Sequence, residues 1–400
     1  MYAFRKPFTA GEFDTMVALP LLPPVHYKIV LVISQVFGYT VSKFIGIKVV
    51  SELAAARRGL AILVLIAWAE LALLGFAMAP TPWDAVFLFL NGVPLGMIWG
   101  LVFGFLEGRQ ASELLGAGLS ASYIVASGVV KSIGAKLIDM GVPEQWMPVT
   151  TGLLFLVPMI FFVALLRAIP PPSAQDEALR IRREPMDGRA RRQFFQSFAP
   201  GLLGLIGLYI LLTSYRDFRD NFAREIWGAV GFADQPEIFA IAEIPIALIV
   251  LVALALLMRI RDNRRALAIV HLMMAFGSAL IGILTLAHAA ELISPTIWLI
   301  GVGVGLYLGY VPFGCILFDR LIACVGWPGT AAFMIYLSDS FGYLGSVGVL
   351  LYKNFGQSEL SWLEFFELFS YVTSIGCTAA FLYSMFYFAR HPLTQRASGG

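Results

Sequence analysis

Six positively charged side chains lie inside stretches of the sequence that are otherwise apolar. They are Arg5, Lys6, Lys43, Lys131, Arg216 and Arg219. An ionisable group is costly to bury in a membrane, so it usually faces a wet cavity or a partner. The planar guanidinium of arginine donates two parallel hydrogen bonds to an oxyanion. A cluster of these cations would bind a small anion, with Lys43 as a point charge and Tyr2 and Tyr39 as hydroxyl donors.

A structural role for the same charges stays open. Asp217 and Asp220 flank Arg216 and Arg219 and could neutralise them. Arg219 could instead extend towards the lipid headgroups, and Lys131 could pair with a carboxylate of the cavity. Because Arg216 and Arg219 are three residues apart, they share one face of a helix, and spacing alone does not select the ligand.

Acidic residues in apolar stretches are candidates for proton coupling. Glu70, Glu243 and Asp339 are of this kind. A carboxyl group in low dielectric favours its neutral form and can take up a proton. Each could also be the salt-bridge partner of a cavity cation. We single out Glu243 and Asp339, the former because Pro245 follows it and can interrupt the helix there.

The composition excludes most soluble proteins. Hydrophobic residues make up 59% of the chain and charged residues 14%, whereas a soluble domain carries about 25% charged residues. All three cysteines lie in apolar stretches, which argues against disulfides and against a metal cluster. No catalytic constellation is apparent, so we expect no enzyme activity and no cofactor. The net charge of +2 gives no reason to expect nucleic acid as a partner.

The apolar runs predict an all-α polytopic membrane protein, because a spanning helix needs roughly 20 apolar residues. Eleven complete spans are expected, at 28–50, 59–79, 84–106, 113–138, 147–168, 197–222, 236–258, 266–288, 295–318, 328–352 and 363–389. The first eight residues read as the second half of a twelfth span. Either the missing half lies upstream of Met1 or this helix is short, and we favour a missing upstream segment.

Positive charges predict the orientation. Of the 28 Lys and Arg residues, 18 fall at the predicted inner ends and three in outer loops. This bias favours cytoplasmic termini, in the cell's inner membrane. The stretch 170–196 is rich in Pro and Arg and predicts a cytoplasmic linker between two six-helix bundles, 1–169 and 197–400. We expect a monomer.

Two pairs of short, similar sequence segments suggest that these halves arose by duplication. Residues 4–8 match 218–222 at an offset of 214, and 105–109 match 317–320 at nearly the same offset. Duplicated six-helix halves, with the substrate at their interface near mid-membrane, are the architecture of the major facilitator fold.

The motifs resemble one branch of that superfamily, the organophosphate:phosphate antiporters, which include glycerol-3-phosphate and hexose-phosphate transporters. The similar stretches are Tyr2 to Phe8, the Tyr-x-x-Ser-Lys-Phe run 39–44, and the runs 329–332 and 341–346. The resemblance implies exchange of an organophosphate for phosphate, with Arg5 and Arg216 as the phosphate ligands and Lys6, Tyr39 and Lys43 beside them.

The chain departs from that branch in several places. Apolar residues near Val125 replace the family's histidine, and the stretch between the last two motifs is longer and contains Asp339. The sequence is more similar still to an uncharacterised bacterial membrane family that shares the Tyr-Ala-Phe-Arg-Lys-Pro-Phe start.

Three functions therefore stay open. The first is a secondary transporter of a small organic anion, an organophosphate exchanged for phosphate. The second is a proton-coupled carrier of a carboxylate, sugar or peptide fragment. The third is a membrane sensor or partner protein that uses a transporter scaffold without transporting.

Overall fold

The computed structural model confirms an all-α membrane protein. It describes residues 1–18, 24–106, 112–170, 188–326, 331–357 and 359–391. Within these residues, eleven helical segments are long and apolar enough to cross a membrane. Helices are expected because lipid offers no hydrogen bonds to the backbone, so each spanning segment must satisfy its own N–H and C=O groups.

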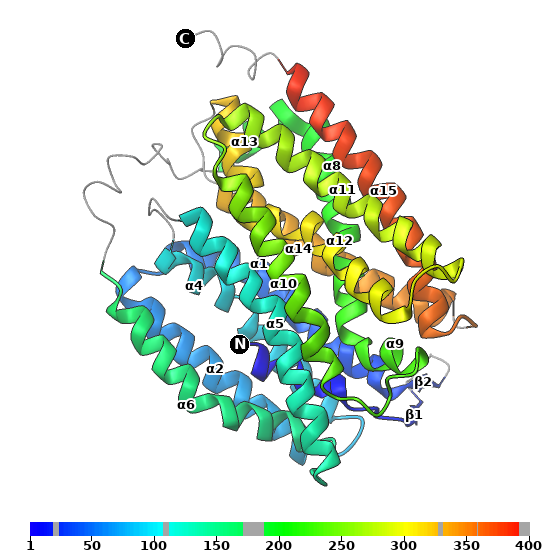
Figure 1. The fold of residues 1–400 in the computed structure, drawn as a ribbon. Coiled ribbons are helices and arrows are strands. Elements are labelled where there is room, and N and C mark those ends of the chain that lie inside the picture. The colour runs from blue at the N-terminus through cyan, green and yellow to red at the C-terminus, as the bar shows by residue number, and fades with distance from the viewer. Residues whose placement is uncertain (19–23, 107–111, 171–187, 327–330, 358, 392–400) are drawn as a thin grey trace.

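The described residues of the first part form two short strands and six α-helices, besides two 3-10 turns. Figure 1 shows how these elements are arranged. Their bounds are η1 (Tyr2–Phe4), η2 (Pro7–Ala10), β1 (Met16–Val17), β2 (Val25–His26), α1 (Tyr27–Glu52), α2 (Ala55–Met78), α3 (Asp84–Leu95), α4 (Ile98–Leu106), α5 (Ser112–Asp139) and α6 (Met147–Ala168). The strands pair antiparallel, Met16 with His26 and Val17 with Val25.

The regular elements described in the second part are all helices, joined by short turns. Its elements are α8 (Gly188–Asn221), α9 (Ala223–Ala229), α10 (Ile238–Met258), α11 (Asn263–Ala289), α12 (Pro295–Cys315), α13 (Leu317–Val325), α14 (Ala331–Leu351), the π-helical turn η3 (Tyr352–Gly356) and α15 (Trp362–Arg390). Most of the predicted linker, residues 171–187, lies outside the described residues. Helix α8 begins before the predicted span and kinks at Phe198, just ahead of Pro200.

The start of the chain differs from the sequence prediction. Instead of half an α-helical span, residues 2–10 form the two 3-10 turns η1 and η2. The break lies at Arg5, whose backbone φ of −124° is outside the helical region. Pro7 then begins the second turn, a position where its missing N–H is not needed. Both turns are nevertheless buried, and Arg5 and Lys6 lie at their junction.

Two predicted spans are interrupted, one in each half. The span 84–106 breaks between α3 and α4, and the span 295–318 breaks at Ile316 between α12 and α13. Pro94 lies in the last turn of α3 and Pro312 in the last turn of α12. Proline removes a helical hydrogen bond, which explains why each helix ends there. Each half therefore has one span that is interrupted just after a proline.

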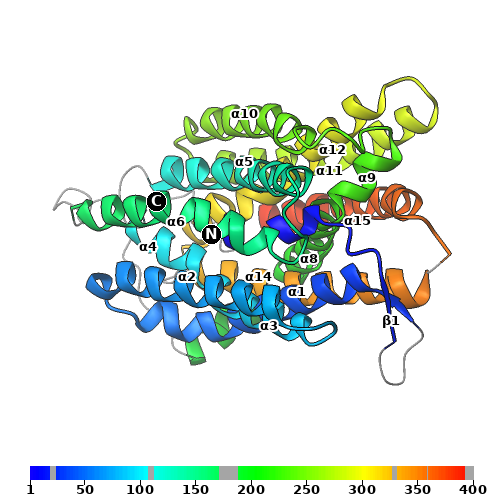
Figure 2. The same ribbon diagram turned by 90° about the horizontal axis from the view of Figure 1, so that it is seen from below.

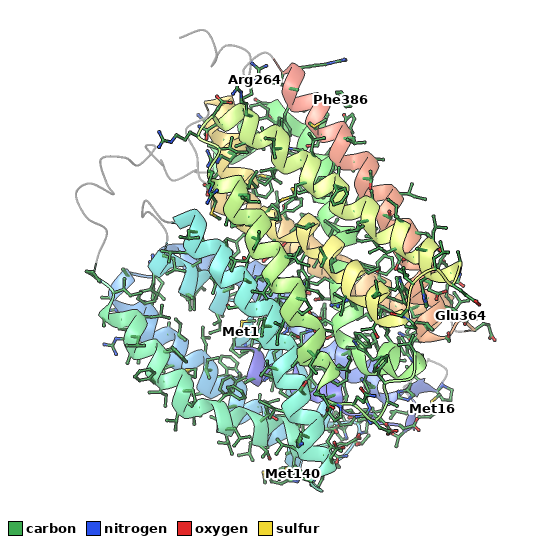
Figure 3. The ribbon with its side chains drawn as sticks, in the orientation of Figure 1. Met1, Met16, Met140, Arg264, Glu364 and Phe386 are labelled. Atoms are coloured by element: carbon green, nitrogen blue, oxygen red, sulfur yellow. The ribbon has the colours of Figure 1, made fainter. Side chains whose placement is uncertain are left out.

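The helices pack as two groups that meet along two seams. In the first group α3 packs on α1 and α2, and α6 packs on α2; in the second, α11 packs on α12 and α15, and α8 on α14 and α15. Between the groups, α5 packs against α10 and α1 against α14 (Figure 2). Met1 lies in the interior between them, whereas Met140 and Arg264 lie at opposite ends of the molecule (Figure 3).

Ion pairs also join the two groups at the end that carries β1 and β2, here called the hairpin end. Lys28 of α1 lies 2.5 Å from Glu225 of α9. Arg224 lies 2.6 Å from Glu12 and also donates to the carbonyl of Ala10. This end is therefore closed by contacts between charged side chains.

Apolar side chains face outward, as expected of a protein surrounded by lipid. Only 22% of the most apolar window of α6 is buried, and Val157, Phe161 and Phe162 are exposed on it. In contrast, 78% of the corresponding window of α12 is buried. Helix α6 is thus peripheral and α12 central, so the side chains of α12 are available to build a site.

Close packing of α5 on α10 provides the first test. A Cβ added at Gly128 would lie 2.1 Å from the carbonyl oxygen of Phe239, so Gly128→Ala must push the helices apart. Overpacking of this kind costs about 1–3 kcal/mol. We expect a lower melting temperature for the purified protein in detergent.

Gly118→Ala is the matched control, because Gly118 lies on the same helix with no atom within 4 Å of its added Cβ. It should leave the melting temperature unchanged or raise it slightly through helix propensity. Equal melting temperatures for the two variants would contradict the close seam.

Candidate functional site

A cavity of about 60 Å³ lies between the two groups of helices. This is room for a few water molecules. Six tyrosines line it: Tyr2, Tyr39, Tyr123, Tyr209, Tyr310 and Tyr343. Lys43, Arg216 and Asp339 add its charged groups. Four of these nine residues come from the first part of the chain, namely Tyr2, Tyr39, Lys43 and Tyr123, and the other five come from the second, so both halves build the cavity wall.

Three cations make cation–π contacts with two neighbouring tyrosine rings of the site. Tyr39 of α1 and Tyr343 of α14 have ring centroids 4.6 Å apart. The Arg5 guanidinium carbon lies 3.8 Å from the Tyr39 centroid and 5.5 Å from that of Tyr343. Lys43 Nζ is 5.3 Å from the Tyr39 centroid and the Arg216 guanidinium 5.3 Å from that of Tyr343. Such cation–π contacts stabilise buried cations by roughly 2 kcal/mol or more when desolvated.

Arg5 stands out because its charge has no acidic contact among the described residues. Its side chain is 2% exposed, and its Nε and Nη2 atoms are buried without a hydrogen-bond partner in the described part of the chain. Side-chain hydrogen bonds hold the backbone at this point in place: Gln35 donates to the Arg5 carbonyl and Asn91 donates to the Phe4 carbonyl. A buried donor without an acceptor is costly, so this guanidinium is poised for an anionic acceptor.

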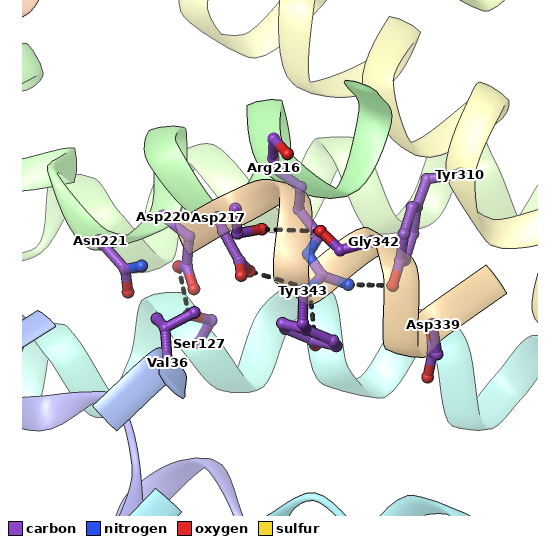
Figure 4. A network of polar contacts seen from close by, with 12 residues as sticks. Val36, Ser127, Arg216, Asp217, Asp220, Asn221, Tyr310, Asp339, Gly342 and Tyr343 are labelled. Carbon is purple, nitrogen blue, oxygen red and sulfur yellow. Dashed lines mark hydrogen bonds and ion pairs between the residues drawn. The ribbon is translucent and has the colours of Figure 1, made fainter. Parts of the chain in front are cut away.

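Arg216 is more fully bonded. It donates to Asp217 at 2.9 Å, to the Tyr343 hydroxyl at 2.7 Å and to the Tyr310 hydroxyl (Figure 4). The adjacent Asp217 is the neutralising partner that the sequence left open. Because Arg216 borders the cavity and Arg219 does not, the geometry favours Arg216 as the ligand from α8.

Lys43 faces Asp339 across the seam between α1 and α14. Lys43 Nζ lies 2.7 Å from Asp339 Oδ2, and the Tyr209 hydroxyl donates to Asp339 Oδ1. The hydroxyls of Tyr209 and Tyr310 are 3.0 Å apart. Asp339, a candidate for proton coupling, therefore lies on the cavity wall as an ion-pair partner.

The remaining predicted cations lie in pairs beside the cavity instead of on its wall. Lys6 Nζ is 2.5 Å from Asp220 Oδ2, and Lys131 Nζ is 2.6 Å from Asp220 Oδ1. Arg219 Nη1 is 2.7 Å from Glu243 Oε1. In the structure described, Lys6, Lys131, Arg219 and Glu243 are therefore members of ion pairs beside the cavity.

Sequence reasoning missed most of the tyrosines. Tyr209 lies seven residues before Arg216, which places both on one face of α8, and this spacing could have identified it. Tyr343 lies inside the run 341–346 that carried the family resemblance. Tyr123 and Tyr310 had no such signal, because single tyrosines in apolar helices are common at any position.

The described residues contain no group of three His, Cys, Asp or Glu side chains that could hold a metal ion. Cys315, Cys324 and Cys377 are buried and free. The polar groups on the cavity wall include the tyrosine hydroxyls, the Arg216 guanidinium, the Lys43 ammonium and the Asp339 carboxylate. Hydrogen-bond donors therefore outnumber the one carboxylate, which suits an anion.

Comparison with solved structures confirms the fold. A D-xylose-proton symporter matches with a TM-score of 0.59 and 14% identity, over 98% of this chain and 95% of that protein. The human organic anion transporter MFSD10 matches with a TM-score of 0.52 and 14% identity, over 90% of this chain and 83% of that protein. The chain therefore has the major facilitator fold that the sequence predicted.

Comparison with curated protein sequences gave no match. A family model described as a family of unknown function, DUF5690, matches residues 7–391. Since this match spans nearly all of the sequence, including both halves, the chain belongs to the DUF5690 family.

Proposed function

We propose that this protein is a secondary active transporter of a small organic anion, an organophosphate exchanged for phosphate. The observation that carries the proposal is Arg5, a buried guanidinium with two unpartnered N–H atoms beside a cavity that Arg216 also borders. Arg5 and Arg216 come from different halves, and both lie about the ring of Tyr343. An oxyanion between them would satisfy the donors of both.

Charge supports an anion over a neutral substrate. Six cations are buried along the interface of the halves, namely Arg5, Lys6, Lys43, Lys131, Arg216 and Arg219. Four carboxylates contact them in the described structure, namely Asp217, Asp220, Glu243 and Asp339. The described site thus has two more cations than carboxylates, an excess that a divalent anion such as a phosphate monoester would balance.

Rocking of the two halves about this site would give alternating access. The protein would act as a monomer in the inner membrane, with both termini in the cytoplasm, as the distribution of positive charges predicts. The solved human transporter of organic anions with the same fold is consistent with such a substrate.

A proton-coupled carrier of a carboxylate, sugar or peptide fragment is the second candidate. Asp339 on the cavity wall favours it, and so does the shared fold of a xylose-proton symporter. The third candidate is a sensor that binds its ligand without transporting it. Such a sensor would bind ligand in detergent but show no flux in proteoliposomes.

Replacing Arg5 with lysine tests the anion site. Lysine keeps the charge but loses the planar fork, and a charged hydrogen bond is worth about 1.5–3 kcal/mol, so affinity should fall roughly tenfold to a hundredfold. The measurement is the stabilisation of the purified protein by inorganic phosphate and by glycerol 3-phosphate, followed as melting temperature against concentration.

Arg224→Lys is the matched control, because Arg224 lies at the hairpin end and bonds to Glu12 and Ala10 outside the cavity. It should keep the full stabilisation by phosphate. Undiminished stabilisation of the Arg5→Lys protein by both phosphates would sink the proposed anion site.

Exchange is tested in proteoliposomes. Vesicles loaded with inorganic phosphate should take up radiolabelled phosphate at least about tenfold faster than empty vesicles, because a loaded carrier returns without an unpaired cation in its cavity. Uptake of an uncharged sugar that collapses with a protonophore, together with no phosphate exchange, would instead establish the second candidate.

A further inference from the structure

The ion pair of Lys43 and Asp339 occupies a special place among the buried pairs. It joins the two halves, since Lys43 lies on α1 and Asp339 on α14, with 2.7 Å between Nζ and Oδ2. Both side chains line the cavity, whereas Arg219 and Glu243 do not. An anion that enters the cavity therefore meets a lysine that already holds a carboxylate of the protein.

A chain of hydrogen bonds connects Asp339 to the other cation of the cavity. Arg216 donates to the Tyr310 hydroxyl, which lies 3.0 Å from that of Tyr209, and Tyr209 donates to Asp339. The donor directions are consistent when Tyr310 donates to Tyr209. A change of charge at Asp339 therefore alters the hydrogen bonding of Arg216, and the reverse, through two hydroxyl groups.

Several helices contribute charged or titratable side chains to the surroundings of Asp339. Besides Lys43 and Tyr209, these side chains are Tyr39, Arg216, Tyr310, Tyr336 and Tyr343. On the neighbouring α13, Arg320 donates to Asn263 of α11 at 2.7 Å, and Lys353 of η3 lies against Trp362. Lys43 is therefore the cation that Asp339 contacts in the described residues.

We propose, on the basis of the anion site proposed above, that the substrate anion displaces Asp339 from Lys43 and that the displaced carboxylate takes up one proton. Two anions beside one lysine in a low dielectric repel each other. A buried carboxylate that has lost its cation favours the neutral form. The proton binds Oδ2, the oxygen that Lys43 leaves, while Oδ1 keeps its hydrogen bond from Tyr209.

This exchange of partners offsets part of the charge that the anion brings. One proton enters with each anion, so binding of a divalent anion lowers the excess of two positive charges at the site to one. When the anion leaves, the proton leaves Asp339 and Lys43 returns to it, which again joins the halves. Asp339 thereby couples anion binding to a proton, as a positioning residue for Lys43.

Calorimetric titration with inorganic phosphate tests the proposal. Titrations of the full-length protein in two buffers of different ionisation enthalpy give the number of protons taken up per phosphate bound. The wild type should take up about one proton more than Asp339→Asn, and the variant should bind phosphate on the order of tenfold more tightly because its competitor is gone, within the usual range of coupling between sites. Protonation of phosphate itself is common to both proteins and cancels.

Glu243→Gln is the matched control, since it also neutralises a buried carboxylate that holds a cation, Arg219, but away from the cavity. It should take up as many protons as the wild type. If Asp339→Asn does not fold, the double variant Lys43→Met with Asp339→Asn removes both charges. It should bind phosphate more weakly, because Lys43 is lost, and without the extra proton.

Equal proton uptake by the wild type and the Asp339 variants would overturn the role of Asp339 and leave the anion site standing. Loss of proton uptake in Glu243→Gln alone would overturn it as well, in favour of Glu243. Absence of phosphate binding in every protein, including the wild type, would overturn the proposed anion site and this inference with it.

Discussion

The cost of burying charge in a membrane governs this structure. Each cation along the interface between the halves must be compensated by a carboxylate, a hydroxyl or an aromatic face. Lys6 and Lys131 share Asp220, while Arg219 has Glu243 and Lys43 has Asp339. Arg5 is compensated mainly by the rings of Tyr39 and Tyr343. The least compensated cation lies next to the cavity, which is where a ligand can complete its coordination.

Several of these pairs connect one half of the molecule with the other. Lys6 and Lys131 belong to the first half and Asp220 to the second, and at the hairpin end Lys28 meets Glu225. Any motion of the halves relative to each other must therefore break ion pairs and form new ones. A ligand that replaces one partner lowers the cost of that motion, so the same electrostatics that hold the halves together can make their motion depend on substrate.

Sequence reasoning was strongest where a property is set by one segment alone. Long apolar runs placed the eleven complete spans to within a few residues apart from the start of α8, whereas the half-span expected at the start of the chain forms η1 and η2. Charge inside apolar runs identified Arg5, Lys43 and Arg216 as neighbours of the cavity. It was weaker where a contact depends on the packing of segments that are far apart in the sequence. The pairing of Arg219 with Glu243, or the division of labour between Arg216 and Arg219, depends on how α8 faces α10 and α12, and helical spacing alone places both arginines on one face.

Tyrosine explains how the site keeps its cations without neutralising all of them. A ring face attracts a cation and a hydroxyl accepts its hydrogen bond, yet neither carries a negative charge. Tyr343 does both for Arg216, accepting a hydrogen bond at 2.7 Å, while its ring also faces Arg5. A carboxylate in the same position would bind the arginines more strongly and would repel an anion. Tyrosines therefore stabilise the empty site while leaving its positive charge available to a substrate.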